Sequence, residues 1–203
     1  MDIPASEDLF ATYLAERQLT FQRHYVVGKG DVDFKVESAG HIVYCDVKEV
    51  RDSQSDPGGR IDAGNQIRSD IRKLRAKFGK TRPQNPLVLV TMNFSSTFFT
   101  AFTVASALLG KTGLVFDRST GEVTSQIHHL PRGNAVLTQR QNRSVSAVLI
   151  YDCGGTNHCL LHSPFADRPV PQGFFPDVQS IYLDRNAKDS SIIALSGRHF
   201  WAF

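Results

Sequence analysis

The chain has 203 residues, of which 41% are apolar and 21% charged, and its formal net charge is +3. A chain of this size can bury about 70% of its unfolded surface, so disordered and fibrous classes are excluded and one domain is expected. Three cysteines are too few to form a disulfide framework. The first eight residues contain no apolar run, and the apolar stretch Phe98 to Leu109 is shorter than the ~20 residues of a membrane span. We therefore expect a soluble, cytoplasmic protein.

The charges are distributed unevenly along the chain. Residues 1–56 contain 11 acidic and 6 basic side chains, whereas residues 60–82 contain 2 acidic and 8 basic ones. Carboxylates bind divalent cations and a basic helix binds phosphates, so this order suits a metal site beside a polyanion track. Two solvated surfaces that never meet would give the same pattern.

The apolar periodicity of the first fifty residues predicts a helix followed by three strands. Ser6 is a good N-cap for an amphipathic helix over residues 7–18, and residues 21–27 are typical of a strand. Residues 32–37 and 42–50 alternate in polarity as two further strands, with a turn from Ser38 to His41 between them. The polar residues 51–59 predict a loop.

A basic helix is predicted next, over residues 66–78. Its apolar stripe consists of Ile67, Ile71, Leu74 and Phe78. One flank of the stripe carries Gln66, Asp70, Lys73 and Lys77, and the other carries Arg68, Arg72 and Arg75.

The remainder of the chain predicts mainly strands. Residues 87–92 are a continuous apolar run, which favours a central strand buried on both faces, and Ser95 or Ser96 can cap a helix that ends at Leu109. Strands are then predicted at 114–117, 146–152 and 158–162. We expect a single α/β domain with a mixed central sheet flanked by helices, comprising a core of about 6–110 and a strand-rich elaboration of about 112–203.

The turn at residues 38–41 fixes the register of the second and third strands. It pairs residues whose numbers sum to 79, so Asp33 faces Asp46. Directly opposite side chains are close enough for both carboxylates to bind one cation, and Lys48 leaves the same face as Asp46. Two carboxylates and a lysine therefore converge.

These residues resemble the PD-(D/E)XK nuclease superfamily, which has the restriction-endonuclease-like fold. The resemblance rests on Asp33, then twelve residues, then Asp46-Val47-Lys48, preceded by a Glu-bearing helix and followed by a helix rich in Gln, Lys and Arg. It extends from Ser6 to about Met92. The proline that gives the motif its name is Val32 in this chain.

The resemblance implies a magnesium-dependent nuclease, an endonuclease on DNA in the first place, with Mn²⁺ as a substitute for Mg²⁺. Asp33 and Asp46 would bind the metal, Lys48 would activate or position the attacking water, and Glu7 and Gln66 would complete the site. A homodimer is compatible with this hypothesis. The phosphate contacts of the basic helix are expected from Arg68, Arg72, Lys73 and Lys77.

Other interpretations of the same residues stay open. Asp33, Asp46 and Lys48 could form an ordinary ion pair on a strand, in a non-catalytic module that binds nucleic acid or protein. Helix geometry does not choose between Glu7 and Glu16, and Gln66 could be a capping or solvent-facing residue. Glu49 is expected on the opposite face from Asp46.

The last motif is a group of cysteines and histidines. Cys153, His158, Cys159 and His162 have a spacing that could suit zinc, or they form a Gly-Gly hairpin with two buried cysteines.

Overall fold

The structure is a computed structural model of the chain. It describes residues 5–50, 63–78, 81–94, 104–105, 107–108, 112–116, 123–129, 136–138, 141–153 and 158–182. The predicted loop at 51–59 and most of the predicted helix from Ser95 or Ser96 to Leu109 lie outside the described residues.

The N-terminal part is a helix followed by an antiparallel meander. The elements are α1 (Ala5–Glu16), β1 (Thr20–Val27), β2 (Gly30–Ser38) and β3 (His41–Val50). The helix α1 ends in a Schellman motif, in which Gln18 has a φ of 56° and the Leu19 N–H donates to the Leu14 carbonyl at 3.0 Å. The predicted helix and all three predicted strands are therefore confirmed to within a few residues.

The middle of the chain adds a helix and the parallel core of the sheet. The elements are α2 (Ala63–Lys77), β4 (Leu87–Asn93) and β7 (Val145–Asp152). Strand β4 pairs parallel with β3 on one side and with β7 on the other. All seven residues of β4 are buried, as its continuous apolar sequence predicts.

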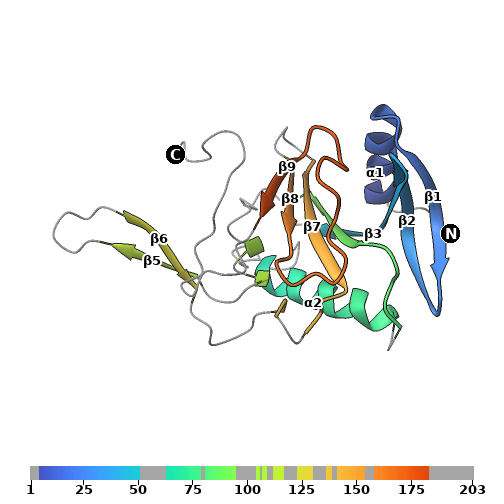
Figure 1. The fold of residues 1–203 in the computed structure, drawn as a ribbon. Coiled ribbons are helices and arrows are strands. Elements are labelled where there is room, and N and C mark those ends of the chain that lie inside the picture. The colour runs from blue at the N-terminus through green and yellow to red at the C-terminus, as the bar shows by residue number, and fades with distance from the viewer. Residues whose placement is uncertain are drawn as a thin grey trace, which may run out of the picture.

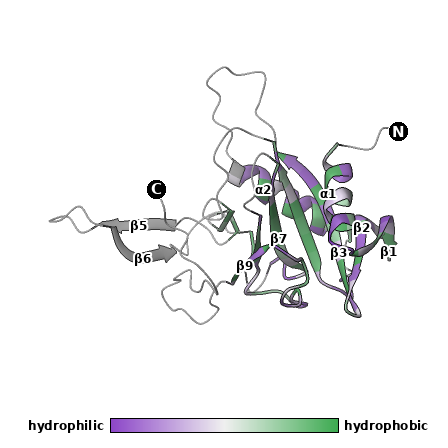
Figure 2. Ribbon diagram, turned by 90° about the horizontal axis from the view of Figure 1, so that it is seen from above, coloured by the Kyte–Doolittle hydropathy of each residue, from purple (hydrophilic) through white to green (hydrophobic). Residues whose placement is uncertain are grey.

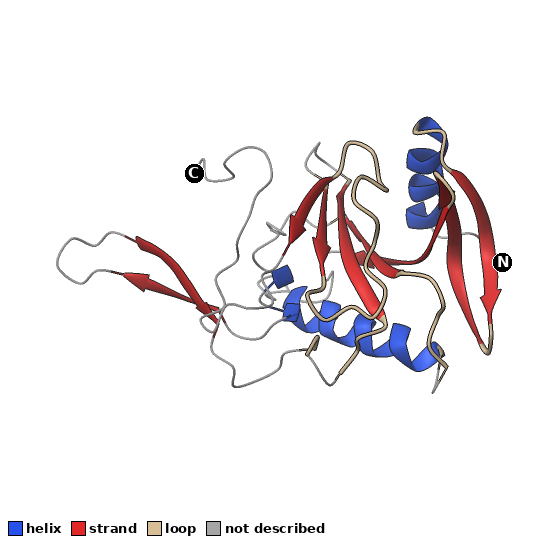
Figure 3. Cartoon of the chain, in the orientation of Figure 1, coloured by secondary structure: helices blue, strands red, loops and turns tan. Residues whose placement is uncertain are grey.

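The C-terminal strands continue this sheet. The strands β8 (Cys159–His162) and β9 (Gln179–Tyr182) complete a seven-stranded sheet of order β1-β2-β3-β4-β7-β8-β9. The irregular connection between β8 and β9 spans residues 163–178 (Figure 3). The two-stranded sheet of β5 (Thr112–Phe116) and β6 (Val123–His129) lies away from the main sheet (Figure 1). Because β7 is hydrogen-bonded to β4, a single sheet contains strands from both the expected core (about 6–110) and the expected C-terminal elaboration (about 112–203).

The two helices pack on opposite faces of the main sheet (Figure 1), and each face has its own apolar core. The α2 face contains Ile67, Ile71, Leu74 and Phe78, which is the predicted stripe, together with Leu87 and Leu89 of β4. The α1 face contains Phe10, Tyr13 and Leu14 together with Val88 and Val90. Figure 2 shows the hydrophobic residues concentrated on the central strands, with both helices mixed in polarity. The fold is thus an α/β arrangement with a mixed sheet.

The start of α1 differs from the prediction. Ser6 lies inside the first turn rather than at the N-cap, and its backbone N–H donates to Glu49 Oε1 at 3.2 Å. A free N–H in the first turn of a helix can be satisfied by any acceptor that the tertiary structure brings near, here a carboxylate of β3. Glu49 thus lies on the α1 face, opposite Asp46, as its position in the strand predicts.

Within the described residues, no helix has the length and apolar character that a membrane span requires.

Candidate active site

The hairpin of β2 and β3 has the register that the sequence predicts. Ala39 and Gly40 occupy a two-residue turn with φ values of 47° and 77°, which are the positive angles of a type I′ hairpin. The ladder runs from the Ser38–His41 pair to the Phe34–Cys45 pair, so every pair sums to 79. The next positions in this register are Asp33 and Asp46.

The ribbon of β1 and β2 turns over at His24 and Asp33. Phe21 packs in the core beneath α1, whereas Tyr25 packs in the core beneath α2, although residues four apart share one face of a flat strand. His24 lies between them with a φ of 50°, a left-handed conformation that interrupts the extended backbone. Asp33 therefore stands where β2 departs from β3.

The Asp33 side chain takes the place of a backbone acceptor at this point. Its Oδ2 accepts the Val47 N–H at 2.6 Å, so the carboxylate is fixed against the edge of β3. Burial, and next the charge of Asp46, raises the pKa of Asp33 above its ordinary value. The bond from Val47 and the charge of Lys48 oppose this shift without cancelling it.

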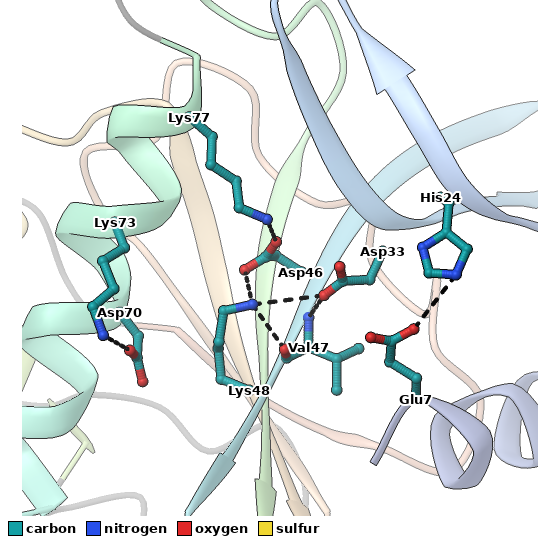
Figure 4. A network of polar contacts seen from close by, with 9 residues as sticks. All are labelled: Glu7, His24, Asp33, Asp46, Val47, Lys48, Asp70, Lys73 and Lys77. Carbon is teal, nitrogen blue, oxygen red and sulfur yellow. Dashed lines mark hydrogen bonds and ion pairs between the residues drawn. The ribbon is translucent and has the colours of Figure 1, made fainter. Parts of the chain in front are cut away.

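The Lys48 ammonium links the two aspartates (Figure 4). Its Nζ lies 2.7 Å from Asp46 Oδ2 and 3.7 Å from Asp33 Oδ2, and it donates to the Val47 carbonyl at 2.9 Å. Asp46 Oδ2 and Asp33 Oδ2 are therefore no farther apart than the sum of their distances to Lys48 Nζ. The structure thus brings the side chains of Asp33, Asp46 and Lys48 together. Lys48 shares the face of Asp46, as the period of the strand predicts, whereas the Asp33 carboxylate lies against the edge of β3.

A second lysine binds the same aspartate from α2. Lys77 Nζ donates to Asp46 Oδ1 at 2.6 Å, and Asp46 itself has no solvent exposure. Burial lowers the pKa of Lys77, but its hydrogen bond and charge interaction with Asp46 outweigh this and leave the pKa above its ordinary value. The sequence predicts Lys77 as a phosphate contact, and the structure instead pairs it with Asp46.

Glu7 enters the site from α1 and is buried. Its Oε2 has no hydrogen-bond partner among the described residues, and His24 Nε2 lies 3.9 Å from it (Figure 4). Burial, and next the charge of Asp33, raises the pKa of Glu7. Glu16, which the helix geometry did not distinguish from Glu7, is exposed and pairs with Arg17. The structure therefore selects Glu7.

The α2 residues divide into two groups. Gln66 Nε2 donates to the Glu49 carbonyl at 2.7 Å, which fixes the end of β3 rather than a carboxylate of the site. Asp70 is buried beside Lys73, whose Nζ lies 3.3 Å from its Oδ1. Arg72 and Lys73 are exposed, and Arg68 is partly exposed with Nη2 bonded to Asn65 Oδ1. Of the predicted phosphate contacts, Arg68, Arg72 and Lys73 thus stay accessible.

Sequence reasoning missed two members of this cluster, Lys77 as a partner of Asp46 and Asp70 as a buried acid. The available signal was their position, because Gln66, Asp70, Lys73 and Lys77 lie on one flank of the helix stripe. Burial, opposed chiefly by Lys73, raises the pKa of Asp70, and the charges of Lys48 and Asp46 also act on it. This flank of α2 therefore faces the aspartates of β3.

The fit of these residues to a divalent cation depends on small side-chain movements. Within the described residues, no group of three or more His, Cys, Asp or Glu side chains is close enough to hold a metal ion as it stands. The donors are nevertheless of the right chemistry, because they are carboxylates in a buried setting. The pKa values of Glu7 and Asp33 are raised, and the buried Glu7 Oε2 has no hydrogen-bond partner among the described residues. The charge of Asp46 raises the pKa of Asp33, and the charge of Asp33 raises the pKa of Glu7, which fits a site whose negative charge a cation would neutralise.

The cysteine and histidine group does not form a zinc site. Cys159 packs against the core on the α2 face, whereas Cys153 packs against the core on the α1 face. His162 stacks on Tyr182 with ring centroids 4.1 Å apart, and His158 stacks on Tyr151 at 4.0 Å. Alternation along β8 directs Cys159 and His162 to opposite faces, so the zinc interpretation is wrong.

Comparison of the chain with protein families, with curated proteins and with solved structures gave no match.

Proposed function

We propose that this chain is a magnesium-dependent nuclease that hydrolyses phosphodiester bonds, as an endonuclease on DNA. The single observation that carries the proposal is the Lys48 ammonium within 3.7 Å of carboxylate oxygens of both Asp33 and Asp46. Two acids and a lysine on adjacent strands are the arrangement of the PD-(D/E)XK motif. The chain order of a helix, three antiparallel strands, a helix and a parallel strand supports the same family.

The residues of the site have distinct roles in this proposal. Asp33 and Asp46 would hold Mg²⁺ (or Mn²⁺), with Glu7 as a further oxygen donor. The bound metal would neutralise phosphate charge and lower the pKa of the attacking water. Lys48 provides a positive charge beside the reacting phosphate, where negative charge develops in the transition state. Gln66 keeps the end of β3 in place through its bond to the Glu49 carbonyl, so we assign it a positioning role.

The substrate backbone would lie along α2. Lys73 lies on the flank of α2 whose Lys77 reaches Asp46, and Arg68 and Arg72 lie on the other flank of the same helix, so a phosphate chain held at Lys73 would pass the site. Such contacts carry no base information, and the proposal includes no sequence specificity.

The test is incubation of the purified protein with supercoiled plasmid, linear duplex, single-stranded DNA and RNA, each with Mg²⁺, Mn²⁺ or EDTA. Nicking of closed plasmid that EDTA abolishes is the expected result, and it identifies an endonuclease. Cleavage that persists in EDTA would exclude the metal mechanism. Cleavage confined to RNA would correct the substrate and leave the site intact.

A second function is a non-catalytic module that binds nucleic acid or protein on the same fold. One observation favours it: both oxygens of Asp46 already contact lysine ammonium groups, so its charge is balanced without a metal. The buried Glu7 Oε2, which has no hydrogen-bond partner in the described part of the chain, argues against it, because a binding module has no use for a buried acid that is not hydrogen-bonded. Binding of DNA with no cleavage of any substrate in Mg²⁺ or Mn²⁺ would establish the binding module.

A further inference from the structure

The charge balance of Asp46 raises a question about how a cation reaches it. Asp46 has no solvent exposure, its Oδ1 lies 2.6 Å from Lys77 Nζ, and its Oδ2 lies 2.7 Å from Lys48 Nζ. An ammonium group therefore contacts each oxygen of the carboxylate. A divalent cation binds carboxylate oxygen at ~2.0 to 2.6 Å, so it can bind Asp46 only where one ammonium group withdraws.

The contacts of the two lysines identify the one that can withdraw. Lys48 Nζ donates a hydrogen bond to the Val47 carbonyl at 2.9 Å, whereas its contacts with Asp46 Oδ2 and Asp33 Oδ2 are ion pairs without hydrogen-bond geometry. Within the described part of the chain, Lys77 Nζ has one hydrogen-bond acceptor, Asp46 Oδ1. A cation at Asp46 would therefore take the acceptor of Lys77 away, whereas Lys48 would keep its hydrogen bond to the Val47 carbonyl and stay in place.

The backbone of Lys77 is fixed, so its release is a side-chain movement. A Cβ on Gly30 would approach the Lys77 carbonyl oxygen to 2.9 Å, which shows that the β1–β2 turn packs closely against the end of α2. The next residue, Phe78, is buried in the core of the α2 face. The Lys77 side chain is 29% exposed, and its four-carbon stem can carry the ammonium outward without moving the helix.

We propose that Lys77 is an exchangeable counter-ion of Asp46: a divalent cation at Asp46 displaces its ammonium group, which then pairs with a phosphate of the substrate. The inference rests on the proposed nuclease function for its second half. The exchange replaces one cation by another at a buried carboxylate, so Asp46 is never left without a positive partner. The released ammonium lies one helical turn beyond Lys73, which is one of the residues assigned to the substrate backbone.

The first test measures competition for Asp46 by calorimetric titration of Mn²⁺ into wild-type protein, Lys77→Met and Lys73→Met. Lys77→Met should bind Mn²⁺ about fivefold or more tightly than wild type, because the competing ammonium is absent. Lys73→Met is the matched control, since it removes the same charge from the same flank without contacting Asp46. An equal gain in Mn²⁺ affinity in both variants would show that only long-range charge repulsion had been removed, and it would overturn the proposal.

The second test needs no variant, so a folding defect cannot obscure it. Wild-type protein is labelled with an amine-reactive ester with and without saturating Mn²⁺, and the modification of each lysine is measured by mass spectrometry. Labelling of Lys77 should rise several-fold with Mn²⁺, while that of Lys73 stays constant. Unchanged labelling of Lys77 in protein that has bound Mn²⁺ would overturn the exchange.

The third test concerns the phosphate contact. Lys77→Met should bind duplex DNA as wild type does in EDTA and more weakly than wild type in Ca²⁺, whereas Lys73→Met should be weaker in both conditions. An equal loss for Lys77→Met in both conditions would mean that Lys77 contacts phosphate without exchange. These readouts are separate from cleavage. If the first two tests give the expected results but the protein cleaves no substrate, the exchange at Asp46 stands and the proposed nuclease function does not. If the protein is an active nuclease but Lys77→Met binds Mn²⁺ as tightly as wild type does, only the exchange proposal is overturned.

Discussion

On the α2 face of the sheet, the side chains change from charged on β3 to mainly apolar on β4 and β7. On β3 this face presents Asp46 and Lys48, and in register on β4 it presents Leu89 and Thr91. One strand further, β7 has Val148 and Ile150 at the same positions. All of these except Lys48 are buried. The same face of one sheet thus carries ion pairs on β3 and apolar packing on β7.

The comparison shows what stability alone would select at these positions. Burial of Leu89 or Val148 removes apolar surface from water at about 25 cal/mol per Å². Burial of Asp46 costs several kcal/mol of hydration, which its lysine partners offset only partly. Apolar side chains such as those of β7 favour folding more than buried ion pairs do, so the charges on β3 support the proposed role of Asp46 and its neighbours.

The largest effect is expected from Lys48→Ala on cleavage. The variant keeps Asp33 and Asp46, so Mn²⁺ should still bind, but it would lack the positive charge beside the phosphate of the proposed reaction. Cleavage should fall by about 10² to 10³, the usual loss for one preorganised electrostatic group. Lys35→Ala is the control, because Lys35 pairs with Glu37 on β2 and stands outside the cluster. If folded Lys48→Ala cleaves DNA as fast as wild type does, the charges of β3 form an ordinary ion pair with no part in cleavage.

The stability comparison is tested by replacing the charged side chains around Asp46 with apolar ones. Asp46→Ala leaves two ammonium groups without their carboxylate and should cost somewhat less than the ~3 to 5 kcal/mol of a fully buried pair, because each lysine is 29% exposed. The triple variant Asp46→Leu, Lys48→Met, Lys77→Met should recover wild-type stability or exceed it, without activity. Urea unfolding measures both. A triple variant less stable than Asp46→Ala would show that the ion pairs stabilise the fold.

Glu7→Gln should stabilise the protein at neutral pH. The pKa of Glu7 is raised by burial and by Asp33, so the folded state favours the protonated form and the charged form destabilises it. Stability from this group is present below the unfolded pKa and is lost as pH rises through the folded pKa. Glu7→Gln should therefore melt higher than wild type at about pH 8, by roughly 2 to 4 °C per kcal/mol, and equally at about pH 4. A variant of lower melting temperature at about pH 8 would contradict the raised pKa.

The smallest effect is expected from the exposed flank of α2. Lys73→Glu should weaken DNA binding about equally for all sequences and make its salt dependence shallower by about one counterion. Fluorescence anisotropy over a salt series measures the slope. Since Lys73 is 68% exposed, the melting temperature should change little. Unchanged affinity would show that the substrate backbone does not follow this helix.

The sequence by itself determined the local elements and the register of the β2–β3 hairpin. A strand repeats every two residues and a helix every 3.6, so apolar periodicity defines which side of each element is buried. The turn at Ala39 and Gly40 needs no distant contact, so it fixed the approach of the Asp33 and Asp46 positions in advance. Lys48 followed from Asp46 because two residues along a strand share a face.

The tertiary structure decided which distant groups meet that hairpin. Lys77 binds Asp46 from 31 residues away, and Glu49 binds the first turn of α1 across 43 residues. The turning over of the β1–β2 ribbon at His24 brought Asp33 to the Val47 N–H, and the packing of α1 buried Glu7. Periodicity describes which side of one element is apolar, whereas these contacts depend on the relative placement of elements. The choice of Glu7 over Glu16 and the capture of Lys77 by Asp46 therefore required the folded sheet.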